Sequence, residues 1–453
     1  MKRTYILLLN ILILLIIVFV APMKANAYAV DKNDYIISHD ADYAVSEDYK
    51  LIPMPKAYVV KDIIINLGEE AGFFLKPEDL FIDDNNILYV ADTGNNRVVK
   101  LDKYGGVINV FTDANGKTFN SPRGVYADKD GDIYIADTEN RRIVHLSPDG
   151  GFIEEFIKPD SALLEGYGFE PTKIFIDKTG YIYVLNQSNY QGFMMIDADN
   201  RFRGYIGSTR VEFSLQQKLI RLFATKEQKD KIAKSLAKPY SNFYIDTDGI
   251  IYATTITAHK DEIVKLNSIG VNIYKSKVYG FYYLDENKNV ISSNFVDIAV
   301  DRNGIISVLE SSLGRIHQYD QEGNCLAIFG GRGYEKGKFT DPSSIAVNSD
   351  GMLYVLDKER GIIQIFEPTR FMKMIHNAVK LYEDGDYEQA KNIWEQVLKI
   401  DSNYELAHRA IGKALVKQEQ YLLAMDEYKK GRDPKGYSKA FIKQRFLFIY
   451  RNF

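Results

Sequence analysis

Residues 122–143 carry the pattern that decides the fold, and they read PRGVYADKDGDIYIADTENRRI. An apolar strand starts at Pro122 and ends at Asp128, a tight turn contains Gly131, and a second strand follows with Tyr134 six residues after the aspartate. Proline suits the first residue of a strand, where the ladder needs no donor. Glycine suits a turn position with positive φ. The stretch therefore predicts two antiparallel strands joined by a tight turn.

The same pattern recurs through residues 57–369. A third strand and a glycine-led fourth strand complete the unit, as at residues 98–101 and 107–111 in the first copy. Four antiparallel strands repeated in this way predict an all-β six-bladed propeller, in which each blade buries its faces against its neighbours. The six copies are anchored at Asp83, Asp128, Asp177, Asp246, Asp301 and Asn348.

The repeat resembles the NHL repeat family. The likeness is close at residues 122–143, and the first copy has the same Ala-Asp-Thr step with Asn and Arg at residues 91–97. Copies three and four depart from the family pattern, because Asn186-Gln187-Ser188 and Thr254-Thr255-Ile256 replace this step. The resemblance implies an NHL-type β-propeller over residues 57–369.

Closure of the propeller is predicted from a missing strand. The sixth copy runs into helical sequence before a fourth strand, whereas residues 58–67 form an orphan strand upstream of the first copy. Pairing this strand into blade six would remove the open edge. Residues 209–238 interrupt the repeat with apolar residues at helical spacing, which predicts a helical insertion. A smaller insertion spans residues 279–294.

Residues 370–453 contain helical repeats at a spacing of 34 residues. Small residues permit close approach of helices while large ones fill the gap beside them, and the segment resembles two tetratricopeptide (TPR) repeats. A further helix over residues 437–450 is expected to cap them, since two repeats alone bury little core. The repeat pairs are Ala378 and Gly412, Tyr387 and Tyr421, Ala390 and Ala424, and Trp394 and Tyr428.

The N-terminus reads as a targeting segment. Lys2 and Arg3 precede an apolar run over residues 5–21, and Ala25-Asn26-Ala27 follows. This order is typical of a secretory signal peptide cut after Ala27, and retention as an N-terminal anchor is the alternative. Residues 28–56 form a lead segment. We therefore expect an extracytoplasmic protein that is secreted or anchored to a membrane.

Charge and cysteine content exclude several classes. The chain has 57 Lys and Arg against 61 Asp and Glu, so no global basic field suggests nucleic acid, and one cysteine excludes a disulfide framework. Residues 28–370 hold 39 cations and 50 anions, whereas residues 429–453 hold eight cations and one anion. The basic, aromatic C-terminus suggests contact with a membrane protein or a membrane surface.

Polar residues at the start of each first strand are expected around the mouth of the propeller channel. Such a ring suits a small polar ligand or an ion. The repeated Asp83 and its equivalents are instead expected to form turns, and Asp92, Asp137 and Asp357 to hold loops. The candidate ligand-binding residues are Glu78, Asp79, Arg123, Lys173, Asn242 and Asp297.

Two functions follow from these patterns. The first is a non-enzymatic binding or scaffold protein, without cofactor, whose propeller face and TPR groove bind proteins, peptides or glycans, for example in an envelope or transport assembly. The alternative rests on resemblance to lactone hydrolases of this architecture: a metal-dependent hydrolase of a small sugar or lactone. Glu78, Asn242 and Asp297 would then hold Ca²⁺ or Mg²⁺ in the channel, because these ions prefer oxygen ligands.

Overall fold

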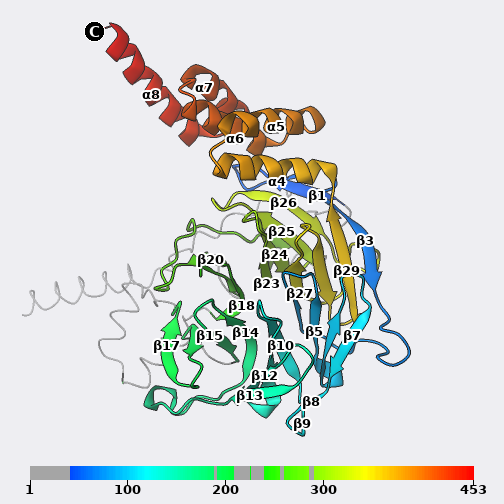
Figure 1. Cartoon of the computed structure of the whole chain (residues 1–453). Helices are drawn as coiled ribbons and strands as arrows, with labels where there is room; N and C mark the ends of the chain where they lie inside the picture. The colour runs from blue at the N-terminus through cyan, green and yellow to red at the C-terminus, as the bar shows by residue number, and fades with distance from the viewer. Residues whose placement is uncertain are drawn as a thin grey trace, which may run out of the picture. The chain divides into compact units, whose positions relative to one another are not determined.

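The computed structural model describes residues 41–187, 191–208, 225, 239–255, 260–284 and 290–452. Six antiparallel sheets surround a common axis and lead into a C-terminal helical region of five helices (Figure 1). The predicted six-bladed β-propeller is thereby confirmed. The signal peptide or anchor expected at residues 1–27 and the helical insertion expected at residues 209–238 lie outside the described residues, apart from Thr225.

Blades one to three each contain four strands in sequence order. Short 3-10 turns η1 (Thr93–Asn95) and η2 (Thr138–Asn140) follow the second strands of blades one and two, and η3 (Ala162–Leu164) precedes blade three. The strands are β4 (Asp79–Ile82), β5 (Leu88–Asp92), β6 (Arg97–Leu101) and β7 (Val107–Phe111); β10 (Pro122–Ala127), β11 (Ile133–Asp137), β12 (Arg142–Leu146) and β13 (Phe152–Phe156); β14 (Pro171–Ile176), β15 (Ile182–Asn186), β16 (Phe193–Ile196) and β17 (Phe202–Ile206).

Blades four to six depart from this regular form. Among the described residues blade four has three strands, blade five has six and blade six has four. Two small hairpins, β8 (Asp113–Ala114) with β9 (Lys117–Thr118) and β21 (Tyr282–Leu284) with β22 (Val290–Ser292), lie in connecting segments. The strands are β18 (Tyr240–Ile245), β19 (Ile251–Thr255) and β20 (Ile263–Leu266); β23 (Phe295–Val300), β24 (Ile306–Glu310), β25 (Arg315–Tyr319), β26 (Cys325–Gly330), β1 (Asp42–Val45) and β2 (Leu51–Met54); β27 (Pro342–Val347), β28 (Leu353–Asp357), β29 (Ile362–Pro368) and β3 (Tyr58–Ile64).

The ring closes through the first part of the chain. Strand β3 pairs antiparallel with β29, from Tyr58 opposite Pro368 to Ile64 opposite Ile363. Blade six therefore contains strands from both ends of the propeller sequence, and its outer edge is the upstream strand that the sequence analysis placed there. Pairing of this kind joins the first and last parts of the ring without a covalent link.

The lead segment adds to blade five, which the sequence analysis did not anticipate. Strands β1 and β2 form a hairpin, and Tyr43 pairs with Ile328 on β26. Buried Asp42 accepts the backbone N–H of Ala57 at 2.7 Å and so fixes the chain where it turns towards β3. Residues 41–54 contain no copy of the repeat, which is why the pattern of the propeller did not reveal them.

The repeated aspartates form turns. Asp128 Oδ1 accepts the backbone N–H groups of Asp130 and Asp132 at 2.9 and 3.0 Å, and Gly131 has a φ of +86° that only glycine adopts readily. Each side chain thus stabilises the turn of its own blade. The same pair of hydrogen bonds is made by Asp83, Asp177, Asp246, Asp301 and Asn348.

The Asp-Thr step after the second strand joins loops and blades. Asp137 accepts the backbone N–H of Asn120 and the side chain of Arg142, both at 2.8 Å. The hydroxyl of Thr138 donates to the carbonyl of Pro171 in the next blade at 2.7 Å. Thr93 donates in the same way to Pro122. The threonine of the Asp-Thr step therefore makes a hydrogen bond between neighbouring blades.

Five helices follow the propeller, and each packs on the next. Ala378, Ala390 and Ala424 are buried at their contacts, and a Cβ on Gly412 would lie only 2.9 Å from the Tyr428 ring. Among the described residues, no helix has the length and apolar character needed to cross a membrane. The helices are α4 (Arg370–Glu383), α5 (Tyr387–Ile400), α6 (Glu405–Lys417), α7 (Tyr421–Lys430) and α8 (Pro434–Asn452).

The helical region and the propeller share a hydrophobic core. Phe371 and Ile375 of α4 belong to the same buried cluster as Leu326 and Phe329 of blade five. The hydroxyl of Tyr404 donates to the carbonyl of Leu326 at 2.8 Å. The helices therefore have a fixed place on the edge of blade five.

Candidate functional site

The first strands of the six blades lie beside one another and line the central axis. Residues two apart on a strand face the same side, so two layers of side chains point towards this axis. One layer consists of Asp79, Gly124, Lys173, Asn242, Asp297 and Ser344, and the next includes Phe81, Tyr126, Phe175 and Tyr244, whose neighbouring ring centroids are 4.5–5.5 Å apart.

Three residues of the polar layer hold neighbouring blades together. Asp79 of blade one accepts the backbone N–H of Val125 in blade two at 2.9 Å. Asp297 of blade five accepts the N–H of Ile345 and the hydroxyl of Ser344, both in blade six and both at 2.7 Å. Ser344 in turn accepts the N–H of Leu80 in blade one at 3.1 Å. A buried carboxylate or hydroxyl thus satisfies a buried donor of the next blade.

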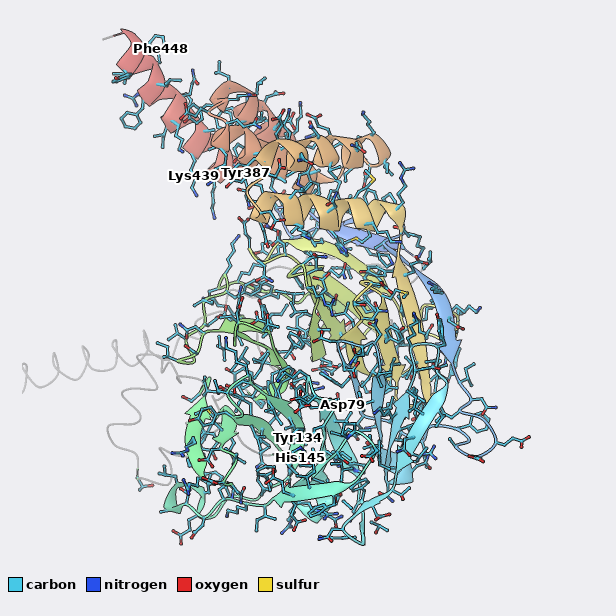
Figure 2. All side chains as sticks on the ribbon, viewed as in Figure 1. Asp79, Tyr134, His145, Tyr387, Lys439 and Phe448 are labelled. Carbon is cyan, nitrogen blue, oxygen red and sulfur yellow. The ribbon has the colours of Figure 1, made fainter. Side chains whose placement is uncertain are left out.

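A buried ion pair spans this layer. Lys173 Nζ of blade three lies 2.5 Å from Asp79 Oδ1, and both side chains are almost fully buried (Figure 2 labels Asp79). Burial lowers the pKa of Lys173, but the carboxylates of Asp79 and Asp297 raise it more, so the amine stays charged. Burial raises the pKa of Asp297 to about 6, although Lys173 acts in the opposite direction.

The remaining candidate residues occupy two places. Glu78 lies within 2.6 Å of Lys358 and 3.7 Å of Arg123, so these residues form an ion-pair network beside the buried layer. Asn242 lies in the polar layer, where its side-chain oxygen accepts the N–H of Phe243 at 2.8 Å. The structure brings Asp79, Lys173 and Asp297 together and places Glu78 and Arg123 outside them.

The suggested metal ligands have other partners in this structure. Both carboxylate oxygens of Asp297 accept backbone N–H groups, and Glu78 faces the ammonium of Lys358. Within the described ranges, no three His, Cys, Asp or Glu side chains gather into a group that could hold a metal ion. The carboxylate oxygens of Asp79 and Asp297 accept hydrogen bonds from neighbouring blades and do not converge on a common centre.

His145 lies in a polar cluster within blade two. Its ring stacks on Tyr134 with centroids 4.1 Å apart, and its nitrogens lie 3.0 Å from Glu154 and 3.2 Å from Asp132 (Figure 2). All four residues belong to one blade, so this cluster has the geometry of a local packing contact.

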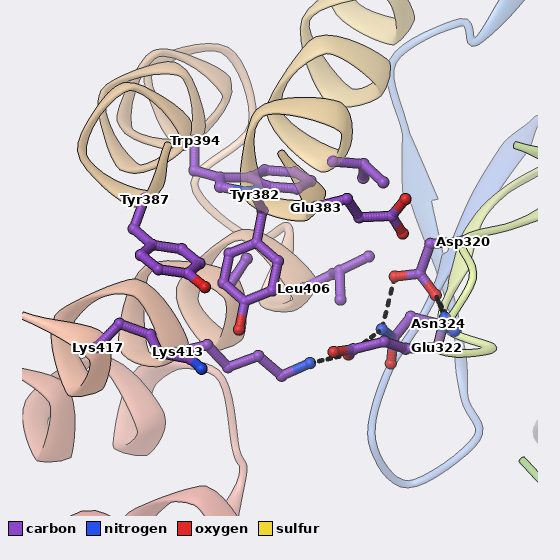
Figure 3. A pocket seen from close by; sticks show the side chains of 12 residues that line it. Asp320, Glu322, Asn324, Tyr382, Glu383, Tyr387, Trp394, Leu406, Lys413 and Lys417 are labelled. Carbon is purple, nitrogen blue, oxygen red and sulfur yellow. Dashed lines mark hydrogen bonds and ion pairs between the residues drawn. The ribbon is translucent and has the colours of Figure 1, made fainter. Parts of the chain in front are cut away.

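A groove lies between the helices and blade five. It has a volume of about 310 Å³ (Figure 3). Apolar and aromatic side chains from α4, α5 and α6 form one wall, and the turn before β26 contributes acidic side chains. The lining residues are Asp320, Glu322, Asn324, Val379, Tyr382, Glu383, Tyr387, Trp394, Leu406, Ala410, Lys413 and Lys417.

Aromatic rings and one unsatisfied donor characterise this groove. The rings of Tyr382 and Tyr387 have centroids 5.1 Å apart. Trp394 is 2% exposed, and its indole Nε1 has no hydrogen-bond partner among the described residues. Leaving a buried donor unsatisfied costs about 1–3 kcal/mol, and the side chains around this N–H would have to shift before an acceptor in the groove could reach it. Lys413 pairs with Glu322 across the groove (Figure 3).

The pKa of Glu383 is raised to about 7 at the groove edge. Desolvation is the main cause, and the nearby carboxylate of Asp320 adds to it. Lys413, Lys417 and Glu322 supply charges of both signs around the aromatic side chains of the groove. Sequence reasoning identified Tyr387 and Trp394 only as repeat residues, because Asp320 and Glu322 lie far from them in the chain and only the fold brings the two sets together.

Comparisons with known proteins agree with the propeller. The NHL repeat family model matches residues 74–101 and 119–146, which cover most of blades one and two. No curated protein sequence matches the chain.

Solved structures of similar fold are remote in sequence. A streptogramin B lyase is 14% identical, with a TM-score of 0.42, over 74% of this chain and 96% of its own. A protein of unknown function from Bacteroides thetaiotaomicron is 12% identical, with a TM-score of 0.45, over 70% of this chain and 77% of its own. The extracellular domain of a hybrid two-component system from the same organism is 16% identical, with a TM-score of 0.41, over 68% of this chain and 42% of its own. These likenesses carry no argument about function, and what the chain itself shows is a six-bladed β-propeller with two recognisable NHL repeats, followed by five helices.

Proposed function

We propose that this chain is a non-enzymatic, extracytoplasmic binding protein that takes up a short extended segment of a partner protein in the groove between α4–α6 and blade five. The observation that carries this proposal is the groove wall formed by Trp394, whose buried indole N–H has no partner among the described residues. A backbone carbonyl of an extended peptide is an acceptor of the required kind, and it needs no particular side chain.

The other lining residues support the same choice of ligand. Val379, Leu406 and Ala410 offer apolar surface for one or two side chains of a peptide. Lys417 and Glu322 lie at the same groove and supply charges of both signs. Binding grooves in proteins typically combine an apolar floor with a few polar groups that fix orientation. The helices would act here as TPR-like repeats, and the propeller would hold them in place.

The alternative, a metal-dependent hydrolase with its site in the channel, has less support. Asp297 and Ser344 are engaged in hydrogen bonds between blades, and Asp79 faces Lys173. A metal cation bound to Asp79 would have to displace the Lys173 ammonium, which already neutralises this carboxylate. We therefore assign the channel residues to the stability of the ring.

The test begins with peptides selected from a displayed random library on the purified chain. Their affinity is then measured by calorimetry for the parent and for Ala410→Phe, which fills the groove with a ring. We expect at least a tenfold loss of affinity in this variant. Gln396→Phe is the matched control, because Gln396 lies exposed on α5 and does not line the groove.

Two outcomes would overturn the proposal. The first is that Ala410→Phe melts like the parent and binds the selected peptides equally well. The second is turnover of a lactone panel that requires Ca²⁺ or Mg²⁺ and disappears in Asp297→Asn.

A further inference from the structure

The C-terminal half of α8 exposes an unusual amount of apolar surface. In Figure 1 this half extends away from α7, with the C-terminus at its tip. Exposed fractions range from 42% for Ile449 to 87% for Tyr450. Ordinary surfaces carry apolar side chains singly, and a contiguous group marks an interaction site. The exposed residues are Phe441, Ile442, Phe446, Phe448, Ile449 and Tyr450.

These apolar side chains surround the helix instead of forming one stripe. Successive residues of an α-helix point about 100° apart, so Phe448, Ile449 and Tyr450 face three different directions. Phe441 and Ile442 diverge in the same way about two turns earlier. A groove or a partner helix covers one face only, and a helix that is apolar on all sides is stable when its whole circumference is buried. The end of α8 therefore calls for surroundings that enclose it.

The charge of α8 is of one sign. Residues 434–453 contain five cations, Lys435, Lys439, Lys443, Arg445 and Arg451, and no Asp or Glu. Residues 28–370 carry 39 cations and 50 anions, so the propeller has the opposite net charge. An anionic surface would attract α8 and repel the propeller, which orients the molecule with the tip of α8 towards that surface.

We propose that the C-terminal half of α8 inserts end-on into the surface of a bilayer that contains anionic lipids. Phe446, Phe448 and Tyr450 enter the boundary between headgroups and acyl chains, which encloses them on every side. Arg445 directly precedes Phe446, and Lys439 lies about two turns before it. Both meet the lipid phosphates, because their long side chains can reach the headgroup level (Figure 2 labels Lys439 and Phe448). Five cations in a helix of 19 residues suit attachment to the surface of the bilayer rather than a helix that crosses it.

The test uses the chain from Tyr28 onward, so that the apolar run at residues 5–21 contributes nothing. Residues 38–453 form one compact unit, and every described contact lies inside it. Vesicles of phosphatidylcholine alone, or mixed with phosphatidylglycerol, are sedimented with the protein at low and at high salt. We expect partitioning into the mixed vesicles at low salt, and at least a tenfold weaker partition either without phosphatidylglycerol or at high salt, because salt screens the attraction.

Two double variants separate the contributions. The first variant combines Phe446→Ser with Phe448→Ser and removes apolar surface. The second combines Lys439→Glu with Arg445→Glu and reverses charge. Each variant should weaken partition into the vesicles at least tenfold. The matched controls are Ile269→Ser and Lys129→Glu, which change exposed residues of the propeller and should partition like the parent. Thermal melting should be the same for all variants, since the substituted side chains are exposed.

Three outcomes would overturn this inference. The first is equal partition of the α8 variants and the parent, and the second is equal partition into vesicles with and without phosphatidylglycerol. The third is a concentration-dependent dimer, seen in the ultracentrifuge, that is lost in the Phe446→Ser, Phe448→Ser variant while the parent binds no vesicles. The last result would assign α8 to a second copy of the chain. Ala410→Phe should leave vesicle binding unchanged, so failure here and failure of the proposed groove are distinguishable.

Discussion

At the scale of single residues, the polar positions of the repeat act between blades. Thr138 reaches the carbonyl of Pro171, Asp79 accepts from Val125, and Asp297 holds Ser344 and the N–H of Ile345. Each of these bonds satisfies a buried backbone group that the strands of its own blade leave open. The candidate channel residues Asp79 and Asp297 thus contribute to the assembly of the ring.

Replacement of Thr138 tests this role. Thr138→Val keeps the shape but removes the donor to the Pro171 carbonyl, which is then buried without it. We expect a loss of about 1–3 kcal/mol in the free energy of unfolding, measured by urea denaturation. Thr138→Ser retains the hydroxyl and should lose clearly less. Equal losses in the two variants would show that methyl packing, and not the bond between blades, matters here.

The buried carboxyl of Asp297 should make stability depend on pH. Burial raises its pKa to about 6, whereas an unfolded aspartate has a pKa of about 3.9. As pH rises from about 4 to about 6, the unfolded chain releases this proton first, so the contribution of Asp297 to stability is complete below pH 4 and is lost by pH 6. In Asp297→Asn the fall of Tm with pH over this window should be shallower by the equivalent of up to about 3 kcal/mol. Parallel Tm profiles for parent and variant would contradict the assignment.

At the scale of elements, the helices depend on blade five. Tyr404 bonds to Leu326 of β26, and its ring stacks near Trp394 with centroids 6.2 Å apart. Phe371 and Ile375 extend the same buried cluster from α4. Two helical repeats and a capping helix would bury little core by themselves, so the propeller completes their hydrophobic face.

Cooperativity of unfolding tests this dependence. Trp394 is the single tryptophan of the chain and lies in α5, while the calorimetric heat of unfolding reports mostly on the larger propeller. We expect the two signals to follow one coincident thermal transition. Tyr404→Phe should lower its midpoint, because the carbonyl of Leu326 loses a donor at a cost of about 1–3 kcal/mol. Separate transitions for the two probes would mean that the helices fold independently.

The sequence predicts some elements well and others not at all. The strands of copies one and two can be predicted from the sequence. The Asp-Thr step, the turn glycine and the strand proline each satisfy a local backbone requirement, as at Gly131 and Pro122. Strands β1 and β2 escaped prediction because their place depends on the free edge of β26, a tertiary feature. The meeting of Asp79, Lys173 and Asp297 follows from their equivalent positions on first strands. The groove was unpredictable in detail, since the turn at Asp320 and the helices meet only through docking.

At the scale of the whole molecule, β3 closes a ring that supports the C-terminal helices at blade five. Deleting residues 57–67 removes the outer strand of blade six and exposes the edge of β29. We expect the cooperative thermal transition of the propeller to be lost, as followed by calorimetry. Replacing the small hairpin at residues 113–118 with a short glycine linker is the control and should leave one transition. An unchanged melting curve after removal of β3 would contradict closure by this strand.

The fluorescence of Trp394 offers the most direct test of the central claim. This claim is that a peptide binds in the groove and accepts a hydrogen bond from the indole N–H. Since the chain has one tryptophan, its emission reports on this site alone. A selected peptide should shift the emission with saturation at the affinity found by calorimetry, and Ala410→Phe should abolish both signals together. Peptide binding of full strength that leaves the emission of Trp394 unchanged would place the binding site elsewhere.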